Sequence, residues 1–233
     1  MKNATLWEVL ALVLVPAVLI VCVATGIEYS ALITTIVVVV SFVPFIVGLE
    51  RQNLKPRNLM PIVVMAALAV AGRIIFIPFP SIQPVSAIVI MTGVVFGKRS
   101  GFLTGMLAAL ISNIFLGQGP WTLWQMYAWG LMGYVAGALV NQGVLRGRIS
   151  VLVFGAMAPI EYGLILDSYY FIGFVTEKTI QAALLAFSFG LPLNVMHAIA
   201  TVGFLAIIYL PWVRKLERIK KKYGIGDEMK VES

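Results

Sequence analysis

The chain has 233 residues, of which 61% are hydrophobic and 12% are charged, and its mean hydropathy is +0.98. Charged residues make up roughly 25% of an average soluble domain, so this composition excludes a water-soluble protein and predicts an integral membrane protein. The formal net charge of +7 does not indicate nucleic-acid binding. The Lys and Arg residues lie in short segments between apolar runs and in a C-terminal run, where membrane orientation and lipid headgroups explain them.

Apolar runs of membrane-spanning length follow one another along the whole chain. A helix needs about 20 apolar residues to cross a bilayer. We therefore predict an all-α integral membrane protein with eight helices, in which an N-terminal transmembrane hairpin precedes a six-helix bundle. The runs lie at residues 6–25, 31–49, 59–77, 83–97, 101–117, 121–141, 149–174 and 180–212.

The distribution of positive charge predicts the orientation of these helices. Short loops rich in Lys and Arg stay in the cytoplasm. With the N-terminus inside and eight crossings, all but two of the 17 Lys and Arg residues are cytoplasmic. The exceptions are Arg73, within a helix, and Lys178, in an outer loop. We expect a multi-pass protein of the cell membrane with both termini in the cytoplasm.

Three parts can be separated by composition. Residues 1–54 form a hairpin with few polar groups and a polar linker, and residues 55–215 form the six-helix unit. Residues 216–233 form a basic cytoplasmic tail, which we expect to lie in water near anionic lipid headgroups.

No motif of an enzyme is present. The segment Gly93 to Arg99 resembles a phosphate-binding loop but is one residue short and has no Ser or Thr after its Lys. His197 is the single histidine and Cys22 the single cysteine, so metal-ligand spacing is missing. The sequence therefore predicts no catalytic residue, no cofactor and no metal site.

Polar side chains gather toward the outer half of the six-helix unit. An uncompensated charge in hydrocarbon costs at least roughly 2.5–3.5 kcal/mol, so Arg73 and Asp167 should face the bundle interior, a partner or water. The nearby loops are rich in Pro and aromatic residues, which stiffen a loop and grip flat apolar ligands. The candidate binding residues are Arg73, Gln83, Asn113, Gln118, Trp121, Trp124, Gln125, Asp167 and Tyr170.

Structural alternatives exist for this group. Arg73 can extend to the outer headgroups and pair with Asp167 without binding a ligand. Trp121 and Trp124 can belong to the aromatic belt of a membrane interface. Nearer mid-membrane, Glu161 is expected to meet Asn194 and His197, as a structural network or as a second site.

Small residues predict close helix contacts. Ala67-x-x-x-Ala71 leaves a smooth face on the first core helix, which lets another helix approach closely. Glycines recur at four-residue spacing and predict contacts inside the bundle; they are Gly93, Gly97, Gly101, Gly105, Gly133 and Gly137.

Three stretches of the six-helix unit carry a family resemblance: MPIVVMAALAVAGRIIF from residue 60, IQPVSAIVIMTGVVFGKRSGFLTGMLAALISN from residue 82, and GQGPWTLWQMYAWGLMGYVAG from residue 117. Over about residues 55–215 the chain resembles the substrate-binding S components of energy-coupling factor (ECF) vitamin transporters. The resemblance implies a six-helix subunit without its own ATPase motif. The extra hairpin is a departure from that pattern.

The resemblance also implies partners and a substrate. S components bind a vitamin at the outer face and dock onto a shared transmembrane scaffold subunit that carries two cytosolic ATPases. Ala67 and Ala71 match the docking surface, and the outer polar and aromatic cluster matches the binding pocket. The pattern looks most like cobalamin-specific members, with pantothenate, pyridoxine or a similar small vitamin as alternatives.

Two other classes of function remain open on the residues alone. A self-sufficient secondary transporter normally shows inverted repeats and broken helices, of which only Pro159 and Pro192 give a hint. A membrane enzyme or an assembly factor could use Glu161 and His197.

Overall fold

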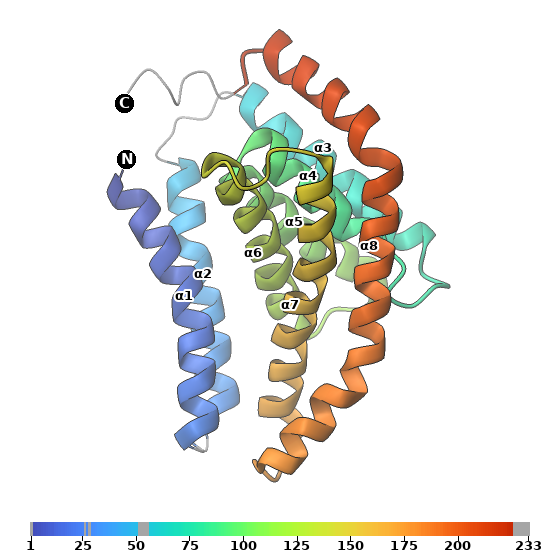
Figure 1. The fold of residues 1–233 in the computed structure, drawn as a ribbon. Coiled ribbons are helices and arrows are strands. Elements are labelled where there is room, and N and C mark those ends of the chain that lie inside the picture. Colours follow the sequence, from blue (N-terminus) through green and yellow to red (C-terminus); the bar gives the residue numbers. More distant parts are fainter. Residues whose placement is uncertain (1, 26, 28, 51–55, 226–233) are drawn as a thin grey trace.

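A computed structural model describes residues 2–25, 27, 29–50 and 56–225. All regular secondary structure in these ranges is α-helical, and it forms eight helices, which confirms the predicted all-α fold (Figure 1). They are α1 (Lys2–Thr25), α2 (Ser30–Glu50), α3 (Pro56–Ile75), α4 (Val85–Phe96), α5 (Lys98–Leu116), α6 (Trp121–Asn141), α7 (Arg148–Phe174) and α8 (Ile180–Lys222).

Several of these helices have the length and composition of membrane spans. Within the described ranges, five helices are long and apolar enough to cross a bilayer, namely α2, α3, α5, α7 and α8. The apolar part of α1, Leu6–Cys22, and the whole of α4, with 12 residues, are shorter. The predicted run at 83–97 is therefore a short buried helix rather than a full crossing, and 11 of its residues are buried.

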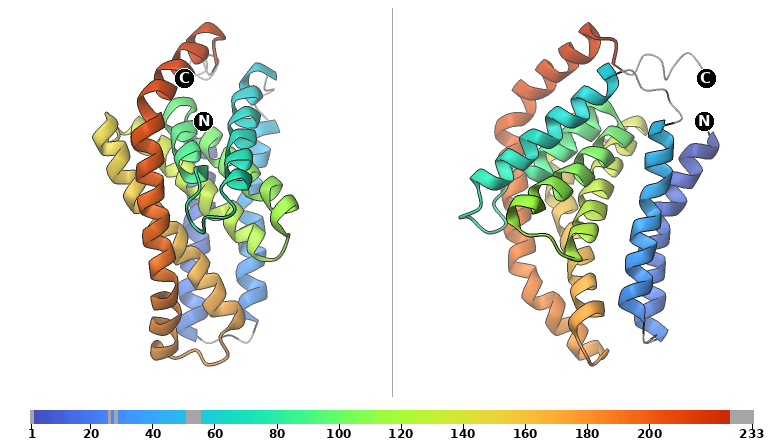
Figure 2. Two further views of the ribbon diagram at one scale, coloured as in Figure 1. Left: turned by 90° about the vertical axis from the view of Figure 1, so that its right-hand side faces the viewer. Right: turned by 180° about the vertical axis from the view of Figure 1, so that it is seen from behind.

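Helices α3 to α8 pack into one bundle, with α1 and α2 standing beside it (Figure 2). The pairs α5–α6 and α7–α8 are in the most extensive contact, and α4 touches every other helix from α3 to α8. The connections 76–84, 117–120 and 175–179 lie away from the C-terminal turns of α8, with 175–179 at the lower tip of the molecule and 76–84 at its right-hand side (Figure 1), and we call this part of the bundle the loop end. The other end carries α8's C-terminal turns and the connections before α5 and α7, and we call it the basic end.

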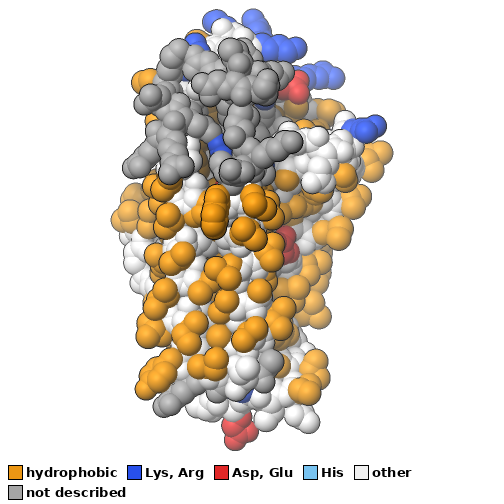
Figure 3. Space-filling model, turned by 90° about the vertical axis from the view of Figure 1, so that its left-hand side faces the viewer, with side chains coloured by type: hydrophobic (Ala, Val, Ile, Leu, Met, Phe, Trp, Pro, Cys, Tyr) orange, Lys and Arg blue, Asp and Glu red, His pale blue; other side chains and the backbone are white. Residues whose placement is uncertain are grey.

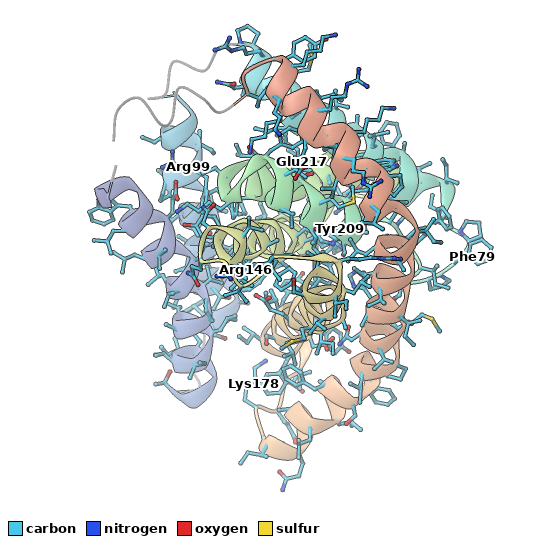
Figure 4. All side chains as sticks on the ribbon, turned by 45° about the horizontal axis from the view of Figure 1, so that its top comes forward. Phe79, Arg99, Arg146, Lys178, Tyr209 and Glu217 are labelled. Carbon is cyan, nitrogen blue, oxygen red and sulfur yellow. The ribbon has the colours of Figure 1, made fainter. Side chains whose placement is uncertain are left out.

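Positive charge gathers at the basic end of the bundle. From the side of α1 and α2, hydrophobic side chains cover a broad belt and most visible Lys and Arg side chains gather at one end (Figure 3). Lys178 lies on the connection after α7 and Phe79 on the connection after α3, away from Arg99, which lies beside α2 (Figure 4). Which end faces the cytoplasm stays a prediction.

Glycines let α5 and α6 approach closely. A Cβ added at Gly101 would overlap the carbonyl oxygen of Gly133, and one added at Gly133 would overlap the carbonyl oxygen of Gly101. Backbone contact of this kind replaces side-chain packing between membrane helices. Close contact is likewise found at Gly93, Gly105 and Gly137, which confirms five of the six predicted glycines, whereas a Cβ added at Gly97 would meet nothing within 4 Å.

The α1–α2 hairpin is held to the bundle by charged and aromatic contacts. Glu8 is 1% exposed, and its carboxylate accepts hydrogen bonds from Arg99 Nε and, at 3.2 Å, from Tyr134 Oη. Lys98 Nζ lies 3.5 Å from the same carboxylate. Phe45 stacks on Phe102 with ring centroids 3.6 Å apart. The prediction that the hairpin carries few polar groups missed this buried carboxylate.

The division of the chain into three parts stays a prediction. The linker residues 51–55 lie outside the described residues. Of the predicted tail, residues 216–222 continue α8, with Leu216 and Ile219 against the core, and residues 226–233 lie outside the described residues.

Candidate functional site

A hydrogen-bonded network joins α3, α5 and α6 at the loop end. Arg73, in the last turn of α3, donates from Nη1 to Ser112 Oγ at 2.5 Å and to Asn113 Oδ1 at 2.7 Å. Asn113 Nδ2 then donates to Thr122 Oγ1 and to Gln125 Oε1, both at 2.8 Å. Arg73 is 9% exposed and Asn113 is 1% exposed, so the structure brings three predicted site residues together away from bulk water.

Aromatic rings and a histidine extend this network toward α8. The Arg73 guanidinium carbon lies 4.9 Å from the ring centroid of Trp129, within the range of a cation–π contact. Trp129 Nε1 donates to Ser86 Oγ at 3.0 Å, and Ser86 Oγ lies 2.7 Å from His197 Nε2. The Tyr162 ring packs 4.7 Å from Trp129 and edge-on, at 5.2 Å, to His197. All six helices from α3 to α8 thus contribute to one polar and aromatic cluster.

The predicted tryptophans differ in their positions. Trp124 is 1% exposed and its ring lies 5.5 Å from Tyr169, so it belongs to the core. Trp121 is 41% exposed at the start of α6, beside Gly119. The two residues are three apart on the same helix, yet only Trp124 faces inward.

Three other predicted residues lie on the connections or the surface of the loop end. Gln118 is exposed and donates to the carbonyl of Leu110 at 3.0 Å. Gln83 is half-buried just before α4. Tyr170 is 54% exposed and stacks on Phe174, with ring centroids 5.8 Å apart. These residues surround the network without a hydrogen bond to it among the described contacts.

Asp167 belongs to a separate contact between α7 and α8. Its carboxylate accepts a hydrogen bond from Asn194 Nδ2 at 2.8 Å and lies against Gly190. In the described contacts Arg73 bonds Ser112 and Asn113, so the alternative in which Arg73 pairs with Asp167 is not what the structure shows.

The expected network of Glu161, Asn194 and His197 is likewise divided. Asn194 donates to Asp167, and His197 pairs with Ser86. In the described contacts neither side chain bonds Glu161. The pair that a catalytic alternative requires, Glu161 with His197, is therefore not formed.

Several network members were missed at the sequence level. Trp129 follows Gln125 by four residues, so helix periodicity could have placed it on the same face, whereas Ser112 directly precedes Asn113 and adjacent residues do not share a helix face. Ser86 and His197 are 111 residues apart, and no pattern within one sequence pairs them.

The chemistry of the cluster suits binding. It offers a guanidinium, two amides, hydroxyls and closely packed aromatic rings within one buried region, and these groups recognise a flat ligand with polar edges. In the described residues, no three His, Cys, Asp or Glu side chains gather as a metal site.

Comparison with known proteins gives a family and several partial relatives. Residues 53–218 match the family described as ECF-type riboflavin transporter, S component. A protein of Streptococcus gordonii named UPF0397 protein is 39% identical over 92 residues, which are 36% of this chain and 49% of that protein. A UPF0397 protein of Lactococcus lactis subsp. cremoris is 31% identical over 104 residues, 43% of this chain and 54% of that protein.

These relatives cover only part of each chain. The chain spans about half the length of the curated relatives it matches. No solved structure matches it significantly. The family match, in contrast, covers the whole of α3 to α7 and α8 as far as Arg218. With a match over more than half of its length, the chain belongs to the family of S components of ECF-type riboflavin transporters.

Proposed function

We propose that this protein is the substrate-capture subunit of an ATP-driven vitamin importer and binds its substrate at the loop end. The observation that carries this proposal is the buried network of Arg73, Asn113 and Gln125. Polar groups buried among membrane helices are costly, so a network that joins the ends of three helices beneath two loops marks a functional site. Positive charge at the other end orients the loop end toward the cell exterior.

The substrate we favour is a vitamin with a flat ring system. Trp129 and Tyr162 supply ring faces, and Asn113 and Gln125 supply amide edges. The family is named for riboflavin, so riboflavin is the first ligand to test. Cobalamin, which the sequence pattern suggested, has no support from the family match and becomes the second ligand, with pantothenate and pyridoxine after it.

A titration of the purified chain tests the proposal. Tryptophan fluorescence should be quenched on binding, since Trp129 lies within the network. Gln125→Ala should weaken binding, whereas Gln142→Ala, an exposed glutamine at the other end of the same helix, should not. If the wild-type chain binds none of the four vitamins and copurifies with no ATPase, the proposal is wrong.

We further propose that α3 presents the docking face for the scaffold subunit. Ala67 and Ala71 are exposed, whereas Ala66 and Ala69, on the other side of the helix, are buried. A stripe of small exposed residues allows close approach of a partner helix. The partners would be a shared scaffold subunit and two cytosolic ATPases.

Larger side chains on this stripe test docking to the scaffold separately from substrate capture. Ala67→Leu with Ala71→Leu should abolish copurification with the scaffold and uptake by cells, and leave vitamin affinity unchanged. Ala17→Leu with Ala31→Leu, on exposed faces of α1 and α2, adds the same bulk elsewhere and should change neither. Uptake by the reconstituted chain alone, without ATPases, would instead indicate a secondary transporter.

A further inference from the structure

Arg73 is a buried cation whose bonds use only part of its guanidinium. Its side chain is 9% exposed, and both of its hydrogen bonds, to Ser112 and Asn113, leave from Nη1. Nε is buried and has no hydrogen-bond partner. Nε and Nη2 form one edge of the guanidinium, and such an edge can donate two parallel hydrogen bonds to a carboxylate or a phosphate.

The groups around Arg73 are neutral. Ser112 and Asn113 accept its hydrogen bonds, and Trp129 offers the face of its ring. Among the residues that the structure describes, no carboxylate lies at ion-pair distance from this guanidinium; Asp167 is bonded to Asn194 instead. A buried charge without an opposite charge is strongly unfavourable in a low-dielectric interior.

The neighbours of Arg73 hold its guanidinium in place. Asn113 accepts from Nη1 through Oδ1, and its own amide nitrogen is fixed by Thr122 and Gln125. The cation is therefore pre-positioned, with an unbonded Nε, two residues before α3 ends at the loop end.

We propose that Arg73 binds an anionic group of the substrate, a carboxylate or a phosphate, and that this group completes the charge balance of the site. This inference rests on the proposed capture function and adds the charge class of the substrate. The aromatic pair Trp129 and Tyr162 would hold the ring system that carries the anionic group.

Matched pairs of probes test the inference. Each pair shares a ring or chain and differs in one charged group: flavin mononucleotide with riboflavin, pyridoxine phosphate with pyridoxine, and pantothenate with panthenol. For at least one pair, the wild-type protein should bind the anionic member about tenfold to a hundredfold more tightly, the contribution expected of charge-assisted hydrogen bonds. Calorimetric titration of the full chain in detergent measures the ratio.

Variants connect that ratio to Arg73. Arg73→Gln should remove the preference for the anionic member. Arg73→Lys should keep the preference with lower affinity, because Lys carries the positive charge but cannot donate two parallel hydrogen bonds. Arg148→Gln removes an exposed positive charge at the basic end and should change nothing. If Arg73→Gln does not fold, the Lys variant still decides: unchanged affinity for the anionic member overturns the inference.

Three results distinguish failure of this inference from failure of the proposed capture function. Binding of a neutral member as tightly as its anionic partner, with the same affinity in Arg73→Gln, overturns the inference and leaves the capture function standing. Absence of binding for every probe defeats the capture function and the inference with it. The third test uses protein in nanodiscs that contain phosphatidylglycerol. If the wild-type protein retains this lipid, Arg73→Gln does not, and the probes do not displace it, then Arg73 binds a lipid headgroup and the substrate assignment is overturned.

Discussion

Removal of the Glu8 carboxylate should release the α1–α2 hairpin from the bundle. Glu8 is 1% exposed and faces two cations and a phenol, Arg99, Lys98 and Tyr134. Loss of one partner from a buried ion pair costs roughly 3–5 kcal/mol. The side chains of Lys98 and Arg99 are 20% and 24% exposed and can reach water after the loss, so we expect the lower figure, about 3 kcal/mol, for Glu8→Ala.

The single cysteine reports this change. Cys22 lies in α1, is 3% exposed, and can react with a thiol probe only when α1 opens. If labelling proceeds through a rapid opening equilibrium, 3 kcal/mol corresponds to a rise of about a hundredfold in the labelling rate. Pulsed labelling of the detergent-solubilised protein, followed by mass spectrometry, measures that rate.

A control and a double-mutant cycle define the cause. Glu217→Gln removes an exposed carboxylate from α8 and should leave the labelling rate unchanged. Glu8→Gln combined with Arg99→Gln should be less destabilised than the sum of the single variants, because each single variant already removes the direct contact between these two side chains. Equal labelling rates for the wild type and Glu8→Ala would refute the argument that this carboxylate holds the hairpin.

Two further substitutions test packing and helix capping. Gly101→Ala should destabilise the bundle by about 1–3 kcal/mol, because its methyl group would overlap the Gly133 carbonyl; a thermal unfolding midpoint equal to that of the wild type would contradict this. Lys178 donates to the carbonyls of Phe171, Ile172 and Val175 at the end of α7, at 2.6, 2.8 and 2.5 Å. Lys178→Met should therefore speed hydrogen exchange in the last turn of α7 and leave exchange in α5 unchanged.

The helices could be predicted from sequence because hydropathy is a local property. Every predicted apolar run overlaps one observed helix, and the largest differences are at the ends, where α1 begins four residues before residue 6 and α8 runs ten residues past residue 212. Bilayer thickness sets the length of a run without reference to any other segment. The short α4 departs from the expected length because neighbours, rather than lipid, surround it.

The site could be predicted only in part. The depth of a residue in the membrane follows from its place in its own helix, whereas its contacts depend on the other helices. Arg73, Asn113 and Gln125 were placed at one depth, and they lie in one network. Asp167 was placed at a similar depth, yet its partner is on α8, the helix that follows it in the hairpin. Depth therefore selects candidates, and the rotation of each helix about its axis, which depends on all its neighbours, decides which of them meet.

Two buried charges of this protein differ in the groups that surround them, and this difference distinguishes a structural role from a binding role. Glu8 is surrounded by two cations and a phenol that belong to the chain, so its charge is balanced whether or not a ligand is bound. Arg73 is similarly buried but touches only neutral groups among the described residues, with its Nε unbonded. If both charges only held helices together, neutral replacements such as Glu8→Gln and Arg73→Gln should both destabilise the ligand-free protein. If Arg73 waits for an anionic substrate, its neutral replacement should leave the ligand-free protein as stable or more stable, because the desolvation cost of the charge is removed and no opposite charge is stranded.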